Sequence, residues 1–254
     1  MRSGEGVLFI HGTASSGRVW KNLLAVLASE PPVQGFCGPS EPVEYLTPDI
    51  PGMGECEVPE GPLSFERWCD YFRGFASGRR LHLVGHSLGG AIAVHLAEEP
   101  WVLSVSLIAP ATRAFCEARR ASSRPGQNPG SILPDRPLTR LVAAPGQISR
   151  EDARILREDY ARAGRLLAKG LPWPPFPKAE AEYLRGKPVL LVYGERDEVI
   201  SPAYFRQLAR DLSAAGVTAE VVSLPGCGHI PQVEDPHRVA GILRSFWREA
   251  CRLR

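Results

Sequence analysis

The chain alternates short runs of consecutive apolar residues with longer stretches whose apolar residues recur every three or four positions. The short runs are typical of parallel strands buried on both faces, and the longer stretches are typical of amphipathic helices. The predicted strands lie at residues 7–10, 43–47, 81–84, 102–109, 188–194 and 219–224. The predicted helices lie at 19–29, 65–72, 90–97, 202–214 and 236–251. This alternation predicts an α/β fold with an open, mostly parallel sheet and helices on both faces.

Two of these helices have recognisable starts. Ser64 precedes an amphipathic stretch with Arg67, not Glu, three residues on, which predicts a simple N-cap without a capping box. Asp235 followed by Pro236 predicts the start of the last helix, because proline fits the first helical position.

The pattern changes between the fourth and fifth predicted strands, where the apolar strand runs stop. Residues 122–137 are rich in Pro, Gly, Ser and Asn, which predicts a loop, whereas 149–169 has the apolar face of a helix. The stretch 171–177 holds four prolines and cannot be the interior of a helix. The predicted domains are therefore a helical cap, or lid, at 111–186 and an α/β core at 1–110 with 187–254.

Composition narrows the classes of partner. The formal net charge is +2 and no block of five or six like charges occurs, which argues against nucleic acid or an anionic membrane as a partner. The N-terminal residues enter a strand without a signal-peptide hydrophobic region, and no apolar run reaches the length of a membrane span. The six cysteines are scattered without a CxxC pair or zinc spacing, so we expect reduced thiols, no metal and no cofactor. We expect a soluble, cytoplasmic monomer or homodimer.

One predicted strand runs directly into a helix through the segment Gly85-His86-Ser87-Leu88-Gly89. An abrupt strand-to-helix turn holds its central residue in a strained backbone conformation, and glycines on either side remove side chains that would clash. Ser87 is therefore expected to stand exposed at the strand tip, beside the first N–H groups of the helix. This arrangement is a nucleophile elbow, and it predicts that Ser87 is a catalytic nucleophile.

A serine hydroxyl is a weak nucleophile and needs a base, which in turn needs a carboxylate to hold its tautomer. His229 is the best-placed base, because it follows the last strand in a glycine-rich loop at the same sheet edge as Ser87. Asp197 is the predicted acid because it lies just after the fifth strand, although spacing alone leaves Glu195 and Glu198 open. Three other histidines are expected to be structural: His82, His95 and His237.

The oxyanion of a tetrahedral intermediate needs N–H donors that are already in place. The backbone N–H of Leu88, directly after the nucleophile, is one candidate. The second is expected from the loop 11–17 after the first strand, with Thr13 as the favoured donor and His11 as a residue that braces the loop.

With these motifs in order, the sequence resembles the serine-type α/β-hydrolase superfamily, and its carboxylesterase-like members with an inserted cap. The resemblance rests on HGTASSG, DIPGMG, GHSLGG, GERDEVISP and GCGHIPQVEDP, and it covers nearly the whole chain outside the cap. It implies an α/β-hydrolase fold with a catalytic triad formed by Ser87, Asp197 and His229. It also implies that the backbone N–H groups of Thr13 and Leu88 bind the oxyanion. The sequence departs from the family at Cys56, where a serine is usual, and in lacking two N-terminal strands, so we expect a shorter sheet.

The nucleophile limits the reactions that this resemblance allows. Members of the superfamily that open epoxides or remove halogens use an aspartate at the elbow, so Ser87 argues against both reactions. The first prediction is hydrolysis of carboxylic esters with small to medium acyl or aryl groups, through an acyl-enzyme intermediate. A thioesterase and a carbon–carbon bond hydrolase or lyase remain alternatives on the same triad. A small-molecule receptor on this scaffold is an alternative of another class.

The cap is the predicted source of further substrate contacts. Trp173 and Phe176 offer apolar surface for an acyl or aryl group, and they fit the interior of the cap equally well. His86, beside the nucleophile, is also a candidate for substrate contact, although packing beneath the elbow explains it more simply. Residues 111–187 carry twelve Arg and three Lys against eight acidic residues, a net charge of +7. This charge would attract an anionic substrate unless the arginines only solvate helix faces.

Overall fold

Six parallel strands form one sheet in the computed structural model, which describes residues 5–29, 43–58, 60–123, 137–144, 146, 148–169 and 172–252. The strands are β1 (Glu5–Ile10), β2 (Glu44–Leu46), β3 (Arg80–His86), β4 (Val102–Ile108), β5 (Val189–Gly194) and β6 (Ala219–Leu224). They lie in the order β2-β1-β3-β4-β5-β6, and every neighbouring pair is parallel. The predicted strands are confirmed to within two residues at each end. The described residues form a sheet of six strands, which agrees with the expected sheet that lacks two N-terminal strands of the family.

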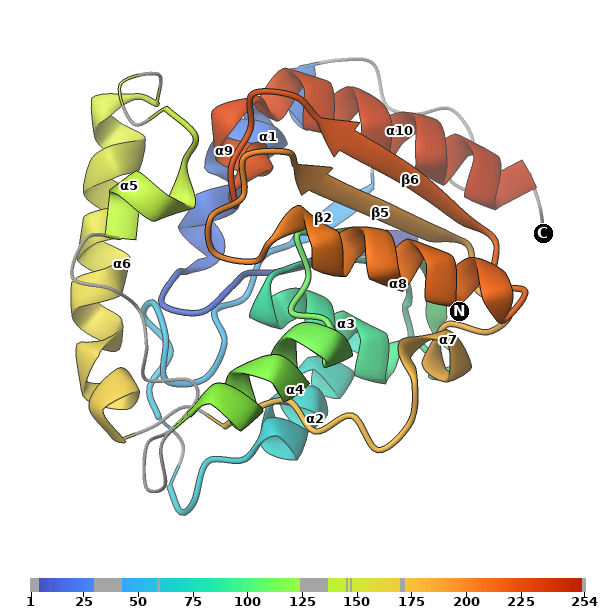
Figure 1. Cartoon of the computed structure of the whole chain (residues 1–254), viewed down its shortest axis with the longest axis horizontal. Coiled ribbons are helices and arrows are strands. Elements are labelled where there is room, and N and C mark those ends of the chain that lie inside the picture. Colours follow the sequence, from blue (N-terminus) through green and yellow to red (C-terminus); the bar gives the residue numbers. More distant parts are fainter. Residues whose placement is uncertain are drawn as a thin grey trace.

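The side chains of the central strands alternate between two apolar layers. In β1, Val7 and Phe9 belong to one buried cluster, and Leu8 and Ile10 belong to the other. The helices over the first layer are α1 (Lys21–Ser29), α9 (Pro231–Glu234) and α10 (Pro236–Arg252). Those over the second are α2 (Phe65–Arg73), α3 (Leu88–Leu96) and α8 (Pro202–Ala214). Figure 1 shows the two groups on opposite faces of the sheet, as predicted.

Local side-chain contacts explain where several helices begin. Ser64 Oγ accepts a hydrogen bond from the backbone N–H of Arg67 at 3.2 Å, which confirms the predicted N-cap of α2. Asp235 Oδ1 accepts one from Arg238 N at 3.1 Å at the start of α10, as predicted. The predicted helix 19–29 is divided, because a 3₁₀ turn, η1 (Gly17–Trp20), precedes α1; a second, η2 (Gly74–Ala76), follows α2.

The described residues between β4 and β5 form four helices, α4 (Arg113–Ser122), α5 (Pro137–Leu141), α6 (Arg150–Lys169) and α7 (Glu180–Tyr183). The helix predicted at 149–169 is confirmed as α6, whereas most of the predicted loop 122–137 lies outside the described residues. In Figure 1, α5 and α6 stand on the side toward which the arrowheads of β5 and β6 point. Buried insert residues join the same two apolar clusters, among them Cys116, Leu156 and Tyr183. The insert therefore packs directly against the sheet and its helices.

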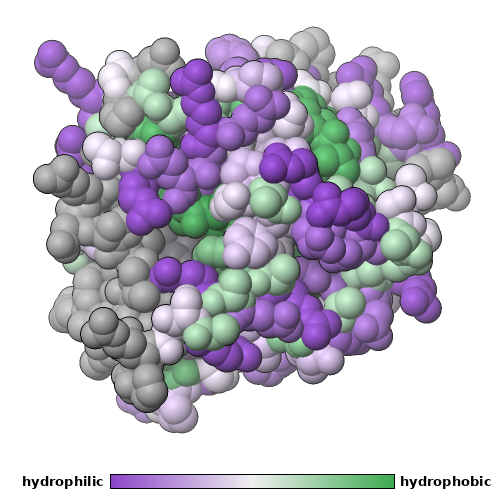
Figure 2. All heavy atoms as spheres, in the orientation of Figure 1, coloured by the Kyte–Doolittle hydropathy of each residue, from purple (hydrophilic) through white to green (hydrophobic). Residues whose placement is uncertain are grey.

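Outside the grey areas of Figure 2, polar residues make up most of the visible face, with smaller apolar areas between them. Val58 and Val221 are the exposed large apolar side chains among the described residues, at 48% and 42% exposure. None of the described helices combines the length and the apolar character needed to cross a bilayer. Apolar burial is concentrated in the two layers beside the sheet.

Gly89, in the first turn of α3, gives the first testable prediction. A Cβ at this position would lie 2.1 Å from Ile10 O and 2.5 Å from His11 O, so an added methyl group forces α3 away from β1. We expect Gly89→Ala to lower the Tm by at least about 5 °C, because a change of 1 kcal/mol moves the Tm of a chain this long by roughly 2–4 °C. Circular dichroism at increasing temperature measures this shift.

The control for this prediction is Gly241→Ala in α10. No heavy atom lies within 4 Å of a Cβ built there, and the position is exposed. Alanine has the higher helix propensity by about 1 kcal/mol, so this variant should keep or raise the Tm. Equal Tm values for the two variants would contradict the close approach of α3 and β1.

Candidate active site

Ser87 occupies the tight turn between β3 and α3. Its φ of 50° and ψ of −115° are strained for a residue with a side chain, at a cost of about 1–3 kcal/mol. Gly85 permits the turn, because a Cβ there would lie 2.4 Å from Gly89 O. Ser87 N donates to Ile108 O at 3.0 Å, and Ser87 O accepts from Ala111 N at 2.9 Å. These two bonds hold the strained turn to the end of β4.

The loop after β1 lies directly against this turn. A Cβ at Gly12 would be 2.8 Å from His86 Nδ1 and 3.1 Å from Ser87 Cβ, so the approach requires a residue without a side chain. Thr13 follows Gly12 in this loop, and Leu88 is the first residue of α3. The segments that carry the two predicted oxyanion donors therefore meet beside Ser87.

His229 and Asp197 form a buried, hydrogen-bonded pair. His229 Nδ1 lies 2.7 Å from Asp197 Oδ2, and the two side chains are 3% and 0% exposed. Asp197 Oδ1 accepts hydrogen bonds from Val199 N and Ile200 N, both at 2.8 Å. Because these bonds fix the carboxylate, they also fix the ring of His229, whose Nε2 faces away from the acid.

The loops after β5 and β6, which carry this pair, touch each other through their backbones. A Cβ at Gly194 would lie 2.1 Å from Gly228 O, which leaves no room for a side chain. Arg196 N donates to Cys227 O at 2.9 Å in the same contact. The carboxyl ends of neighbouring parallel strands thus meet at one sheet edge, as the order of the elements predicts.

The insert takes part in holding the loop around His229. His229 N donates to Leu141 O, at the end of α5, at 2.8 Å. The Glu234 carboxylate accepts from Gly228 N at 2.8 Å and from Ala143 N at 2.7 Å, so one side chain ties the loop to the insert. Burial raises the pKa of Glu234. The sequence does not mark Glu234 as a site residue, although Glu234 lies in the motif GCGHIPQVEDP. It does not mark Leu141 either, which acts through its backbone.

Two buried histidines brace the site from beneath. His86 Nε2 donates to His229 O at 2.8 Å, and the His86 residue is 3% exposed, so it packs under the elbow and not at a substrate surface. His11 Nδ1 donates to Gly12 O at 2.8 Å, and its Nε2 accepts from Ile50 N at 2.8 Å. Burial lowers the pKa of both rings, and the neighbouring His229 lowers that of His86 further. His11 therefore braces the loop, as predicted.

The rival candidates point elsewhere. Glu195 is exposed and accepts a hydrogen bond from Ser223 Oγ at 2.9 Å, and Glu198 is also exposed. His82 Nδ1 lies 2.7 Å from Ser104 Oγ inside the sheet, and His237 is exposed at the start of α10. Of the three acids left open by spacing, Asp197 is the one that contacts His229.

Trp173 and Phe176, predicted to contact substrate, fasten the segment before α7 to the rest of the protein. Trp173 Nε1 donates to Cys116 O at 3.2 Å, within the insert. Phe176 packs on His95, with ring centroids 5.0 Å apart. His95 is eight residues beyond Ser87, about 12 Å along α3. The structure therefore brings Phe176 to the flank of α3 and not to Ser87.

The arrangement defines what the site can do chemically. A serine in a strained turn, an imidazole oriented by a carboxylate, and N–H groups at a helix start together suit nucleophilic attack at an electrophilic carbon. Within the described residues, no group of three or more His, Cys, Asp or Glu could hold a metal ion. The five cysteines in that part of the chain are free thiols: Cys56, Cys69, Cys116, Cys227 and Cys251.

Comparison with known sequences identifies relatives. The epoxide hydrolase EphH of Mycobacterium tuberculosis is 30% identical over 191 residues, which cover 67% of this chain and 87% of the relative. A dihydrolipoyllysine-residue acetyltransferase component of the acetoin cleaving system from Pseudomonas putida is 29% identical over 182 residues, covering 67% of this chain and 46% of that protein.

Solved structures and a family model agree with the fold. A meta-cleavage product hydrolase from Pseudomonas fluorescens has a TM-score of 0.69 at 19% identity, over 98% of this chain and 92% of that one. Naproxen esterase from Bacillus subtilis has a TM-score of 0.67 at 17% identity, over 96% and 84%. At such identities the likeness shows the fold alone. The model of the alpha/beta hydrolase family matches residues 7–242, and this protein therefore belongs to that family and is a hydrolase.

Proposed function

We propose that this protein is a serine hydrolase that cleaves carboxylic esters of small to medium acyl or aryl groups. The observation that carries the proposal is the 2.7 Å contact between His229 Nδ1 and Asp197 Oδ2, at the sheet edge where Ser87 occupies its strained turn. In this assignment Ser87 is the nucleophile, His229 is the general base and Asp197 holds the tautomer of His229. Residues 111–186 form the cap of this site.

The first half of the reaction forms an acyl-enzyme. Ser87 Oγ attacks the ester carbonyl carbon while its proton passes to His229 Nε2. The carbonyl oxygen becomes an oxyanion, which accepts hydrogen bonds from the N–H groups of Leu88 and Thr13. The carbon–oxygen bond to the alcohol then breaks, and His229 gives its proton to the departing alcohol.

The second half returns the enzyme to its starting state. His229 takes a proton from a water molecule, whose oxygen attacks the acyl carbon through a second tetrahedral intermediate. The bond to Ser87 Oγ breaks, Ser87 recovers its proton from His229, and the carboxylic acid leaves. Each proton transfer uses the same nitrogen, so a single fixed imidazole serves both halves.

The chemistry of serine favours esters over epoxides, despite the name of the relative from Mycobacterium tuberculosis. An aspartate that opens an epoxide forms an ester, which water can cleave. Ser87 would instead form an ether, which the same machinery cannot hydrolyse, so turnover would stop after one event. Water-driven turnover through Ser87 therefore requires an acyl group.

An alcohol leaving group also matches the proton donors near Ser87. Expulsion of an alcohol needs one proton, which His229 supplies. The rings of His11 and His86 are not further donors for a leaving group, because they donate to Gly12 O and His229 O. His229 is therefore the proton donor that the site offers to a departing alcohol.

The assignment of Ser87 is tested with p-nitrophenyl esters of increasing acyl length. We expect Ser87→Ala to lower kcat by at least about 10⁴-fold, the usual loss when the nucleophile of a triad is removed. Ser223→Ala, a serine on β6 bonded to Glu195, should keep wild-type activity. A fluorophosphonate should add its mass once to wild type and to Ser223→Ala, and not to Ser87→Ala.

Three outcomes would contradict the proposal. Ester hydrolysis that survives Ser87→Ala would exclude this nucleophile. Turnover of styrene oxide, with no ester of the series cleaved, would favour epoxide chemistry. A single slow turnover, together with a ligand-dependent rise in Tm, would favour a receptor.

Glu234 gives a second prediction for this site. The Glu234 carboxylate accepts hydrogen bonds from the N–H groups of Gly228 and Ala143. Glu234→Gln places an NH₂ group against one of these two N–H groups, so one of the two bonds that tie the His229 loop to the insert is lost. We expect a Tm lower by several degrees, since a hydrogen bond to a charged group contributes about 1.5–3 kcal/mol, and a lower kcat. Glu195→Gln, an exposed acid in the neighbouring loop, is the control and should change neither value.

A further inference from the structure

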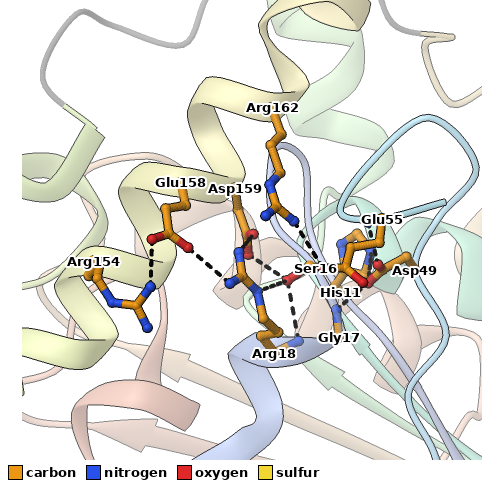
Figure 3. Close-up of polar contacts among 10 residues, drawn as sticks. All are labelled: His11, Ser16, Gly17, Arg18, Asp49, Glu55, Arg154, Glu158, Asp159 and Arg162. Atoms are coloured by element: carbon orange, nitrogen blue, oxygen red, sulfur yellow. Dashed lines mark hydrogen bonds and ion pairs between the residues drawn. The ribbon is translucent and has the colours of Figure 1, made fainter. Parts of the chain in front are cut away.

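Asp159 is a buried charge in the middle of α6, and it faces the loop after β1 (Figure 3). Its side chain is 0% exposed, so the carboxylate is stable only with close partners. Oδ2 accepts a hydrogen bond from Ser16 Oγ at 2.5 Å, and Oδ1 forms an ion pair with the Arg18 guanidinium. Both partners lie in the chain segment that follows Thr13, more than 140 residues away in sequence.

The same loop is anchored at its other points by groups of the core. At its start, the His11 ring accepts from Ile50 N at 2.8 Å. At its end, Gly17 N donates to Asp49 Oδ1 at 2.6 Å, and a Cβ at Gly17 would lie 2.1 Å from Thr47 O. Asp159 is the group of the insert that bonds inside this loop, at Ser16, and Figure 3 shows it opposite Asp49. Glu158, its neighbour on α6, reaches Arg18 just beyond the loop at 3.0 Å. The residues between these anchors carry the backbone N–H assigned to the oxyanion.

We infer that Asp159 is a positioning residue for the oxyanion loop, so that helix α6 of the insert fixes the N–H of Thr13 toward the reacting carbonyl. This inference rests on the proposed function. An oxyanion donor contributes only when it is already in place, and a displacement of about 1 Å costs roughly 100-fold in rate. A fully buried carboxylate that bonds the hydroxyl of Ser16 prevents such a displacement.

Other contacts hold α6 against the core without involving the loop after β1. They make it possible to distinguish the positioning of that loop from the docking of the helix. Lys21 Nζ contacts Glu151 Oε1 at 2.5 Å, and both side chains are about half exposed. Asn22 Nδ2 donates to both oxygens of Asp152 at 3.0 Å. These contacts join α6 to α1 without touching the loop after β1. Glu151→Gln is therefore the matched control, since it removes one carboxylate of α6 and leaves Ser16 untouched.

The experiment compares Asp159→Asn, Ser16→Ala and Glu151→Gln with wild type, using a p-nitrophenyl ester. We expect Asp159→Asn to lower kcat by about 10–100-fold with a KM within about twofold of wild type. A trifluoromethyl ketone, whose adduct carries an oxyanion, should lose affinity by a similar factor. Glu151→Gln should change neither value. Ser16→Ala, which keeps the Arg18 ion pair, tests the same loop if Asp159→Asn fails to fold.

Hydrogen exchange of residues 11–20 supplies a readout that does not depend on catalysis. The amides of this segment should exchange at least about tenfold faster in Asp159→Asn than in wild type or Glu151→Gln, because local opening of the loop becomes easier. Unchanged exchange, or equal losses of kcat in Asp159→Asn and Glu151→Gln, would overturn the positioning role while the ester assignment stands. If wild type cleaves no ester, the proposed function fails, and the exchange data still decide whether Asp159 anchors the loop.

Discussion

The close approach of three backbone segments around Ser87 is the constraint on which the rest of this structure depends. α3 starts so near β1 that Gly89 has no room for a side chain, and the turn before it holds Ser87 at a positive φ. Such strain persists only where the surroundings over-determine the conformation. Here, hydrogen bonds to Ile108 and from Ala111 tie the turn to β4, so the loops after β1, β5 and β6 converge on a fixed point.

The features that could be predicted from the sequence are those written in neighbouring residues. The strands read as short apolar runs because both of their faces are buried, and the elbow was recognisable because its glycines lie within two residues of Ser87. The contact between Asp197 and His229 is predictable from the parallel order of the strands alone, because each residue lies just after a strand and the carboxyl ends of parallel strands meet at one edge of the sheet. Spacing alone does not separate Asp197 from Glu195, because the choice depends on which side chain is turned inward from the loop, and it was the family resemblance that selected Asp197.

The contacts that were not predicted join residues far apart in the chain. Asp159 meets Ser16 across 143 positions, and the helical pattern of α6 marks it only as a polar residue. Leu141 holds His229 through a carbonyl, which leaves no trace in residue type. Phe176 was expected to contact substrate on aromatic character alone, whereas the course of the chain before α7 brings it to His95. In each case the three-dimensional course of the insert decides the contact, and local spacing does not encode it.

The contacts of the insert with the loops around Ser87 limit how this protein can change in evolution. The backbone of Leu141 bonds the His229 loop, and the carboxylate of Asp159 bonds the segment after β1, so the insert is not an exchangeable module. A chimaera with the corresponding segment of another family member would bring foreign groups to both points and disturb the loops that it was meant to leave intact. Selection for new ligands would therefore proceed through single substitutions within the insert, with these two attachments retained.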